Sequence, residues 1–290
     1  MEGFLNLNKP KGPSSFQVVD TVRKALSTKK AGHAGTLDPH ATGVLVVGLG
    51  KATRLIPFVS DLEKEYIATI RLGLSTDTLD EEGEVLARKE VPPLTIQEIK
   101  EALSEFTGEI EQVPPPFSAV RIEGERLYDL AREGIRVHTK PKRVFVHELE
   151  LLESKGDMLV IRSLVSKGTY IRALARDLAK RLGTLGIVEN LVRTRVGHFT
   201  IENSVSPDDP GLSKKILPPD HGLAHFPPVR LTPAGASVFK RGNRVSSAGI
   251  KERPAKVKAF EHVRVYSPDG DFIGVGSWLP AGVQPRRVYR

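Results

Sequence analysis

Apolar residues recur at helical spacing in three parts of the chain. The pattern predicts helices over residues 15–26, 96–106 and 170–182, and a shorter one over 126–132. Ser14 or Ser15 can cap the first helix, and Thr95 with Glu98 forms a capping box before the second. The apolar positions of the three long helices are, in order, Phe16, Val19, Val22 and Leu26; Ile96, Ile99, Leu103 and Phe106; and Ile171, Leu174, Leu178 and Leu182.

Other segments are rich in β-branched and aromatic residues and predict strands. Two pairs of them read as hairpins, because a glycine-containing turn separates the two halves. These turns are Lys-Gly-Asp at 155–157 and Pro-Asp-Gly-Asp at 268–271. The expected strands cover residues 44–49, 65–72, 84–88, 144–152, 158–165, 191–201, 263–266 and 272–275.

The order of these elements predicts an α+β fold, because helices and strands mix without strict βαβ alternation. Residues 204–228 are rich in Pro, Ser, Asp and Gly and read as a connection. After this connection, short β-like runs alternate with turns. We therefore expect a larger domain over residues 1–227 and a small β-rich domain over residues 228–290.

The composition is that of a globular protein, with 290 residues of which 39% are hydrophobic and 27% charged. No apolar run is long enough to span a bilayer, and the N-terminal residues lack the apolar core of a signal peptide. A cytoplasmic location without membrane contact is therefore expected. The chain has no cysteine, which excludes disulfides, thiolate metal sites and a cysteine nucleophile.

The formal net charge of +8 favours a polyanionic partner, with nucleic acid as the first candidate. A generic soluble surface with excess Lys and Arg would give the same total. Clustering favours nucleic acid, because phosphate binding needs cations spread along one face. The clusters are Lys9 and Lys11; Arg23, Lys24, Lys29 and Lys30; and Lys140, Lys142 and Arg143.

Residues 32–43 read Gly-His-Ala-Gly-Thr-Leu-Asp-Pro-His-Ala-Thr-Gly and lead directly into an apolar strand. The three glycines let a ligand approach the backbone closely, and Pro39 restrains the residue before it. The segment predicts a rigid loop that presents the carboxylate of Asp38 and the imidazole of His33. For the loop alone, an Asp-Pro turn whose carboxylate bonds its own backbone is the simpler interpretation.

Five ordered motifs resemble the TruB family of bacterial tRNA pseudouridine synthases, and the resemblance runs from residue 8 to the C-terminal end. The first motif surrounds Asp38. In one departure from the family pattern, Arg121 stands where a lysine is expected, which keeps the charge but changes the donor geometry. The other motifs are Lys64-Glu65-Tyr66, Pro-Pro-Phe-Ser-Ala at 115–119 with residues 124–134, Lys-Gly-Thr-Tyr-Ile-Arg at 167–172 and Leu-Val-Arg-Thr at 191–194.

This resemblance implies a pseudouridine synthase fold with a mixed, mainly antiparallel central sheet, an insertion at 73–117 and a small C-terminal PUA-like β-barrel. It implies isomerisation of uridine 55 in the T-loop of tRNA to pseudouridine, with the target base flipped out. The reaction breaks a C–N glycosidic bond and joins C5 to the same sugar carbon. Because no redox change takes place, no cofactor is expected, and no residues have metal-ligand spacing.

The resemblance assigns the catalytic role to Asp38. A carboxylate can act there as a nucleophile or as an anionic stabiliser, at ribose C1′ or at uracil C6, and the sequence leaves both open. Arg172 is the cation expected beside it, since an adjacent cation offsets the desolvation of a carboxylate.

The family pattern also assigns residues to the binding of uridine and RNA. Tyr66 is expected to stack on the uracil and to accept or relay the C5 proton. Tyr170 and Leu191 are expected to line the uridine pocket, and His33 to enter the T-loop. The residues expected to bind RNA elsewhere are Lys9, Lys11, Lys64, Arg121 and Arg193.

The expected partner is the T-stem-loop of tRNA, bound by a monomer that needs no protein partner. A guide-RNA-dependent synthase shares the Asp38 motif, but the 73–117 segment and the small C-terminal domain fit the stand-alone form better. A non-catalytic RNA-binding or RNA-chaperone module shares the charge but does not need Asp38, Tyr66 and Arg172 together. A glycosidase needs a second catalytic carboxylate, which no motif supplies.

Overall fold

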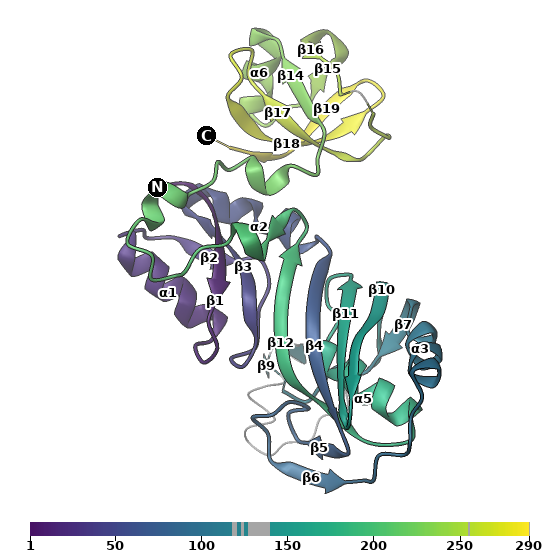
Figure 1. Cartoon of the computed structure of the whole chain (residues 1–290). Coiled ribbons are helices and arrows are strands. Elements are labelled where there is room, and N and C mark those ends of the chain that lie inside the picture. Colours follow the sequence, from purple (N-terminus) through teal and green to yellow (C-terminus); the bar gives the residue numbers. More distant parts are fainter. Residues whose placement is uncertain (118–120, 123–124, 127–139, 255, 290) are drawn as a thin grey trace.

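A computed structural model describes residues 1–117, 121–122, 125–126, 140–254 and 256–289. Its largest element is a nine-stranded sheet (Figure 1). From one edge to the other the sheet contains β1 (Gly3–Lys9), β3 (Thr42–Leu49), β12 (Gly186–Val196), β4 (Lys64–Leu72), β11 (Met158–Val165), β10 (Lys142–Lys155) and β7 (Gly108–Gln112), with β2 (Ala31–His33) paired to β3 and β13 (Phe199–Thr200) paired to β12.

All pairs in this sheet are antiparallel except β12 with β3, which is parallel. The expected α+β fold with a mixed, mainly antiparallel central sheet is therefore confirmed. The expected strand at 191–201 was placed wrongly, because β12 begins at Gly186 and ends at Val196. A bulge at Glu189 interrupts its pairing with β4, and Gly197 turns the chain with a φ of +54°.

The described helices are α1 (Ser15–Ala25), α2 (Ile56–Ser60), α3 (Ile96–Glu105), α5 (Ile171–Arg181) and α6 (Pro233–Lys240). Of these, α1, α3 and α5 begin and end close to the predicted residues, whereas α2 and α6 were not predicted. Ser14 and Thr95 each make a complete capping box, with Gln17 and Glu98 respectively, which explains where α1 and α3 start. None of the helices described combines the length and the hydropathy that a membrane span requires.

The apolar face of α1 differs from the one predicted. Phe16 was expected in the core, but 74% of its surface is exposed. Val18, Val19 and Val22 pack instead against β1 and β3. These residues form one stripe at helical spacing, and Phe16 lies outside it because successive residues are about 100° apart on a helix.

The segment 73–117 adds a separate two-stranded sheet, helix α3 and an edge strand. Within it β5 (Leu74–Thr76) pairs with β6 (Val85–Arg88), and β7 joins the main sheet beside β10. The predicted helix at 126–132 is contradicted at its first residue, since Arg126 lies in β9 (Glu125–Arg126), which pairs with β8 (Arg121–Ile122). Residues 127–132 lie outside the described part of the chain.

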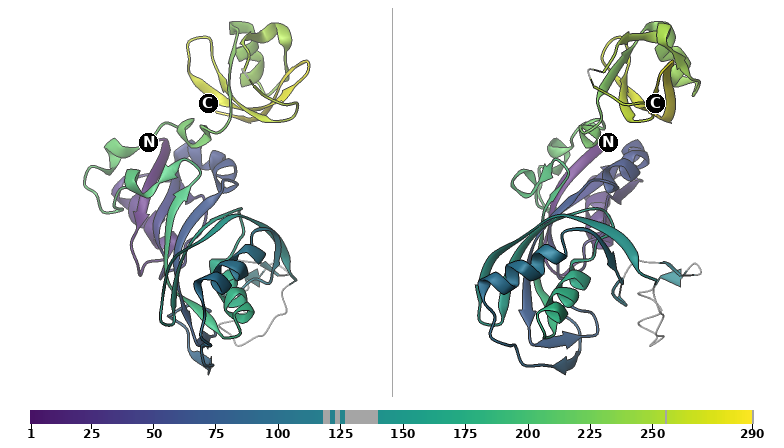
Figure 2. Two further views of the ribbon diagram at one scale, coloured as in Figure 1. Left: turned by 45° about the vertical axis from the view of Figure 1, so that its right-hand side comes forward. Right: turned by 90° about the vertical axis from the view of Figure 1, so that its right-hand side faces the viewer.

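The C-terminal part forms its own six-stranded sheet, which curls into a partial barrel beyond one end of the main sheet (Figures 1 and 2). The predicted hairpin at 263–275 is confirmed as the pair β17 and β18. The order of strands is β15 (Val245–Ser246), β19 (Gly282–Val288), β18 (Phe272–Leu279), β17 (His262–Tyr266), β14 (Pro228–Leu231) and β16 (Ile250–Glu252).

The connection between the two sheets packs back onto the edge strand β1. The backbone N–H of Asn8 donates to the carbonyl of Val205, and that of Leu217 donates to the carbonyl of Phe4. The connection therefore covers an otherwise open sheet edge. The domain boundary expected near residue 228 stays a prediction.

Helices α3, α5 and α1 pack on different parts of the main sheet. The sheet arches over α3 and α5 (Figure 2), which pack under β4, β11 and β10 in one core cluster. Helix α1 covers β1 and β3 further along the sheet. The loop 34–41 lies between these two packed regions, so residues 37 and 41 belong to the first cluster and residue 34 to another.

Candidate active site

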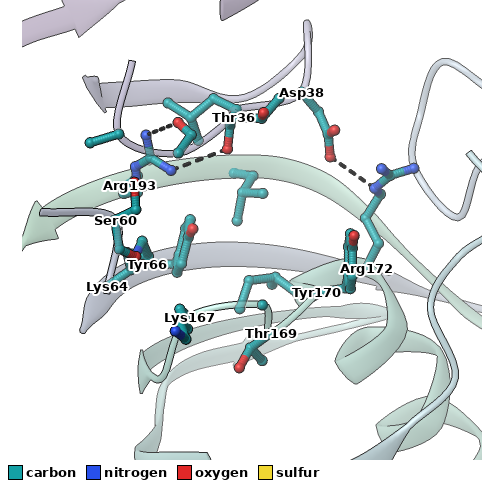
Figure 3. A pocket seen from close by; sticks show the side chains of 16 residues that line it. Thr36, Asp38, Ser60, Lys64, Tyr66, Lys167, Thr169, Tyr170, Arg172 and Arg193 are labelled. Carbon is teal, nitrogen blue, oxygen red and sulfur yellow. Dashed lines mark hydrogen bonds and ion pairs between the residues drawn. The ribbon is translucent and has the colours of Figure 1, made fainter. Parts of the chain in front are cut away.

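A cavity of about 270 Å³ opens between the loop after β2, the N-terminus of α5 and the centre of the sheet (Figure 3). The elements that meet here are far apart in sequence, so the tertiary fold assembles the site. Its lining residues are Ala34, Gly35, Thr36, Leu37, Asp38, Ser60, Lys64, Tyr66, Lys167, Gly168, Thr169, Tyr170, Ile171, Arg172, Leu191 and Arg193.

The loop that carries Asp38 is fixed by side chains that bond its backbone. The Ser15 hydroxyl donates to the carbonyl of Leu37 at 2.9 Å and accepts from the N–H of Leu37 at 2.8 Å. At the end of the loop, a Cβ on Gly43 would lie 2.2 Å from the carbonyl oxygen of Arg193 on the neighbouring strand. Glycine is therefore required there for the close approach of β3 and β12.

Asp38 and Arg172 form the ion pair that was expected. Nε of Arg172 lies 2.9 Å from Oδ2 of Asp38 (Figure 3). The Arg172 side chain is only 5% exposed, whereas that of Asp38 is 34% exposed. The cation is thus part of the protein interior, and the carboxylate remains open to a ligand in the cavity.

The remaining nitrogens of Arg172 are also bonded. Nη1 donates to the carbonyl of Thr78 at 2.7 Å and lies 3.3 Å from Oδ2 of Asp80, and Nη2 donates to the carbonyl of Phe117 at 2.8 Å. The sequence assigned no role to Asp80, which is only 4% exposed. Arg172 therefore lies between two carboxylates, of which only Asp38 lines the cavity.

The walls of the cavity include the aromatic and apolar residues predicted to lie there. Tyr66 on β4 and Leu191 on β12 are both buried with their side chains toward the cavity. Tyr170 caps α5 and is held by Gln112, which accepts from the Tyr170 N–H at 2.8 Å and donates to its carbonyl at 3.1 Å. Sequence reasoning missed Gln112, because nothing near the end of β7 distinguishes it from a surface glutamine.

Three of the five cations expected to bind RNA are buried, and their binding of RNA stays a prediction. The ammonium of Lys9, with no exposed surface, donates to the carbonyls of Pro10, Pro39 and Ala41 at 2.9, 3.0 and 2.7 Å. Burial lowers the pKa of Lys9 to about 8. A lysine enclosed in this way supports the Asp38 loop through its backbone carbonyls.

Lys64 and Arg193 support the floor of the same site. Lys64 donates to the carbonyls of Ser60 and Leu62, and burial lowers its pKa to about 8. Arg193 donates to three carbonyls, those of Val44 at 2.7 Å, Thr36 at 3.2 Å and Gly35 at 3.0 Å. Both side chains therefore donate to backbone carbonyls, and each also lines the cavity.

The other two predicted cations differ from these. The Lys11 side chain is 58% exposed and pairs with Glu81. The backbone of Arg121 lies in β8, and its side chain lies outside the described part of the structure. Lys167, which sequence reasoning left unassigned, is exposed at the cavity wall and pairs with Asp61.

His33 ends β2 immediately before the residues that line the cavity. Its Nδ1 accepts from the N–H of Gly35 at 3.4 Å, and burial together with nearby Arg193 lowers its pKa. His33 is therefore neutral at neutral pH. Among the described residues, no group of three or more His, Asp or Glu is arranged to hold a metal ion.

Both parts of the chain match models of one protein family. The model described as TruB family pseudouridylate synthase (N terminal domain) matches residues 23–171, and that described as Pseudouridine synthase II TruB, C-terminal, matches residues 227–289. Two curated proteins named tRNA pseudouridine synthase B are similar over 100% of this chain and 96% of their own length. The protein from Cereibacter sphaeroides is 46% identical, and that from Ruegeria sp. (strain TM1040) is 41% identical.

Solved structures of related enzymes share the fold. A chain of an H/ACA ribonucleoprotein bound to a substrate RNA containing 2′-deoxyuridine is 26% identical, with a TM-score of 0.77 over 99% of this chain and 85% of that chain. A chain of a Cbf5-Nop10-Gar1 complex is 27% identical, with a TM-score of 0.78 over the same shares. The two family models and the full-length relatives together show that this chain belongs to the TruB family of pseudouridine synthases.

Proposed function

We propose that this protein isomerises uridine 55 in the T-loop of tRNA to pseudouridine, with Asp38 as the catalytic residue. One observation carries the proposal. A partly exposed carboxylate, ion-paired to a buried arginine, faces a cavity whose wall includes a buried tyrosine. A protein that only bound RNA would have no use for a carboxylate at that point, since it repels phosphate.

The cavity has the size and lining for one flipped base. Its volume of about 270 Å³ is just below the ~300–1,000 Å³ typical of pockets for drug-sized ligands. Tyr66 supplies an aromatic face on which the uracil stacks, and Leu191 and Tyr170 close the other sides. His33, at the edge of the loop, occupies the space that the flipped nucleotide leaves in the RNA.

The reaction rearranges bonds without a net change of composition. The bond from N1 of uracil to C1′ of ribose breaks, the base turns, and a bond from C5 to C1′ forms. C5 loses a proton, N1 gains one, and the hydroxyl of Tyr66 accepts or relays the C5 proton. Asp38 acts as a nucleophile at C1′ or at C6, and Arg172 fixes its orientation while water leaves the cavity.

Contacts outside the cavity hold the rest of the tRNA. Lys11 and Arg121 are the proposed phosphate contacts of the larger domain, residues 1–227. The domain of residues 228–290 is proposed to bind the end of the acceptor stem. In support, a second cavity of about 590 Å³ there is lined by Arg253, Lys256 and Arg264, and by Arg230 paired with Glu252.

The likeness to the H/ACA ribonucleoprotein favours one second candidate, a guide-RNA-dependent synthase. Identity to those chains is 26–27%, compared with 41–46% to the proteins named tRNA pseudouridine synthase B. We therefore propose a monomer that acts in the cytoplasm on bare tRNA, without a protein partner or cofactor. A glycosidase is disfavoured, because the second carboxylate of the site, Asp80, is enclosed and bonded to Arg172.

The test is to incubate a T-stem-loop transcript with the purified protein alone and to map pseudouridine in the product. We expect one modified position, at the uridine equivalent to 55. A transcript with cytidine at that position is the control. Activity that appears only with a guide RNA or accessory proteins supports the second candidate, and absence of product under every condition overturns the proposal.

A further inference from the structure

His40 is a buried polar residue in the candidate site that the proposed reaction does not use. It follows Asp38 and Pro39 in the same loop and is 1% exposed. Neither of its ring nitrogens has a hydrogen-bond partner that meets full geometric criteria within the described residues. Nδ1 nevertheless lies 3.4 Å from Oδ2 of Asp80. An enclosed imidazole without a partner costs stability, so this approach to a carboxylate requires an explanation.

The partners of Asp80 show what His40 can supply. Oδ1 of Asp80 accepts from the Thr78 hydroxyl at 2.5 Å and from the N–H of Glu82 at 3.2 Å. Oδ2 faces Nη1 of Arg172 at 3.3 Å and Nδ1 of His40 at 3.4 Å. A proton on Nδ1 would therefore complete the set of donors around this carboxylate.

The charged groups around the loop also indicate that His40 donates to Asp80. The Arg172 guanidinium serves two carboxylates, Asp38 and Asp80, in a largely enclosed place. The nearby ammonium of Lys9 is occupied by carbonyls, two of which belong to Pro39 and Ala41 on either side of His40. Among the described side chains, His40 is thus the nearby group that can give Asp80 a further donor.

We propose that His40 is a positioning residue, which donates from Nδ1 to Asp80 and thereby holds the Asp80 carboxylate against Arg172. Arg172 then keeps its Nε on Asp38. His40 thus acts on Arg172 through Asp80, and Arg172 in turn orients Asp38, which lies two residues before His40 in the same loop. This inference rests on the proposed function, because its consequence is measured as pseudouridine formation.

The kinetic test compares two substitutions of His40. His40→Leu removes the donor at similar volume, and His40→Asn retains a donor near the place of Nδ1. We expect His40→Leu to lower the single-turnover rate about 10- to 100-fold, with tRNA affinity within about twofold of wild type. His40→Asn should regain most of the rate. His147→Asn, which changes a partly exposed histidine paired with Glu63, should match wild type.

A double-mutant cycle separates positioning through Asp80 from a general effect on the fold. In an Asp80→Ala background, His40→Leu should change the rate by less than about twofold, because the group it positions is gone. An unchanged rate in His40→Leu alone overturns the proposal. An equal fall of rate in both backgrounds also overturns it.

A third measurement observes the hydrogen bond in the wild-type protein and does not depend on activity. In the ¹⁵N-labelled wild-type protein, long-range ¹H–¹⁵N spectra report which ring nitrogen of His40 carries a proton, with the signal assigned from His40→Asn. A proton on Nδ1 supports the proposal, and a bare Nδ1 overturns it. If the wild type forms no pseudouridine, the proposed function fails while this result still decides the hydrogen bond.

Discussion

The ion pair between Asp38 and Arg172 joins an open carboxylate to an enclosed cation. The guanidinium is bonded on every nitrogen, to Asp38, Asp80 and two backbone carbonyls. The position of Arg172 is therefore fixed before a ligand arrives, and Asp38 takes its orientation from it. Preorganisation of this kind lowers the barrier of a reaction, because no charge has to move into place.

Arg172→Lys should reduce turnover by about 10²–10³-fold. A lysine keeps the charge but cannot reach Asp38, Asp80 and both carbonyls together, since its donors share one nitrogen. The measurement is the single-turnover rate on a T-stem-loop transcript. Arg176→Lys, one helical turn away and partly exposed, is the matched control and should stay within a few-fold of wild type. A rate in Arg172→Lys close to that of the control would count against the role given to the pair.

Tyr66→Phe should separate stacking from proton transfer. The ring stays, so the affinity for tRNA should be unchanged, whereas loss of the hydroxyl should slow the reaction about 10²–10⁴-fold. Binding and single-turnover kinetics on one preparation give both numbers. Tyr289→Phe is the control, because the hydroxyl of Tyr289 bonds Glu2 at the chain terminus. Wild-type kinetics in Tyr66→Phe would contradict a role of the hydroxyl in proton transfer and would leave stacking as the only role of Tyr66.

Lys9→Met and Lys11→Met should affect different properties of the protein, although the two lysines are near neighbours in sequence. Lys9→Met leaves three carbonyls without their donor and should destabilise the protein by about 1–3 kcal/mol. Lys11→Met should leave stability unchanged and reduce the slope of log Kd against log salt by about one. Thermal unfolding and salt titrations check both. If Lys9→Met lowers the salt slope instead, Lys9 is an RNA contact.

The stability of the protein should fall as the pH falls below 6.5. His198 packs on the ring of Phe199, with centroids 4.3 Å apart, and beside His221. Burial, and then the neighbouring His221, lower the pKa of His198 below its ordinary 6.5. The unfolded chain then binds a proton that the folded chain does not, so this stabilisation is present above pH 6.5 and is lost below it.

Urea unfolding between pH 5 and 8 measures that dependence. His198→Phe keeps an aromatic ring in the cluster and removes the titrating group. The free energy of unfolding of His198→Phe should therefore change less between pH 6.5 and 5 than that of the wild type. Equal changes in the two proteins would show that His198 does not contribute.

Local patterns in the sequence were sufficient for much of the fold. The capping boxes at Ser14 and Thr95 determine where two helices begin, since they satisfy backbone groups within four residues. The Asp38 loop was also recognisable, because its glycines permit backbone conformations that other residues resist and Pro39 restrains the residue before it. Phe16 was misplaced, since several stripes of α1 are consistent with its spacing and only tertiary packing selects one.

Burial was the property that the sequence did not reveal. Lys9, Lys64 and Arg193 resemble surface cations by type, and only the assembled sheet encloses them. Asp80 is one of several acidic residues in its loop. Its pairing with Arg172 depends on the docking of that loop, in which the N–H of Val188 donates to the carbonyl of Leu79. These features of the site depend on contacts between segments far apart in sequence, which local sequence patterns do not reveal.

Asp38→Asn tests the central claim most directly. The substitution keeps the shape of the side chain and removes the carboxylate that the proposed reaction requires. Wild type and variant are incubated with a T-stem-loop transcript labelled with tritium at C5 of uridine, and tritium release and RNA binding are both measured. We predict that release from the variant is abolished while the affinity for RNA is retained. Tritium release by Asp38→Asn at the wild-type rate would contradict the assignment of Asp38 and the mechanism built on it.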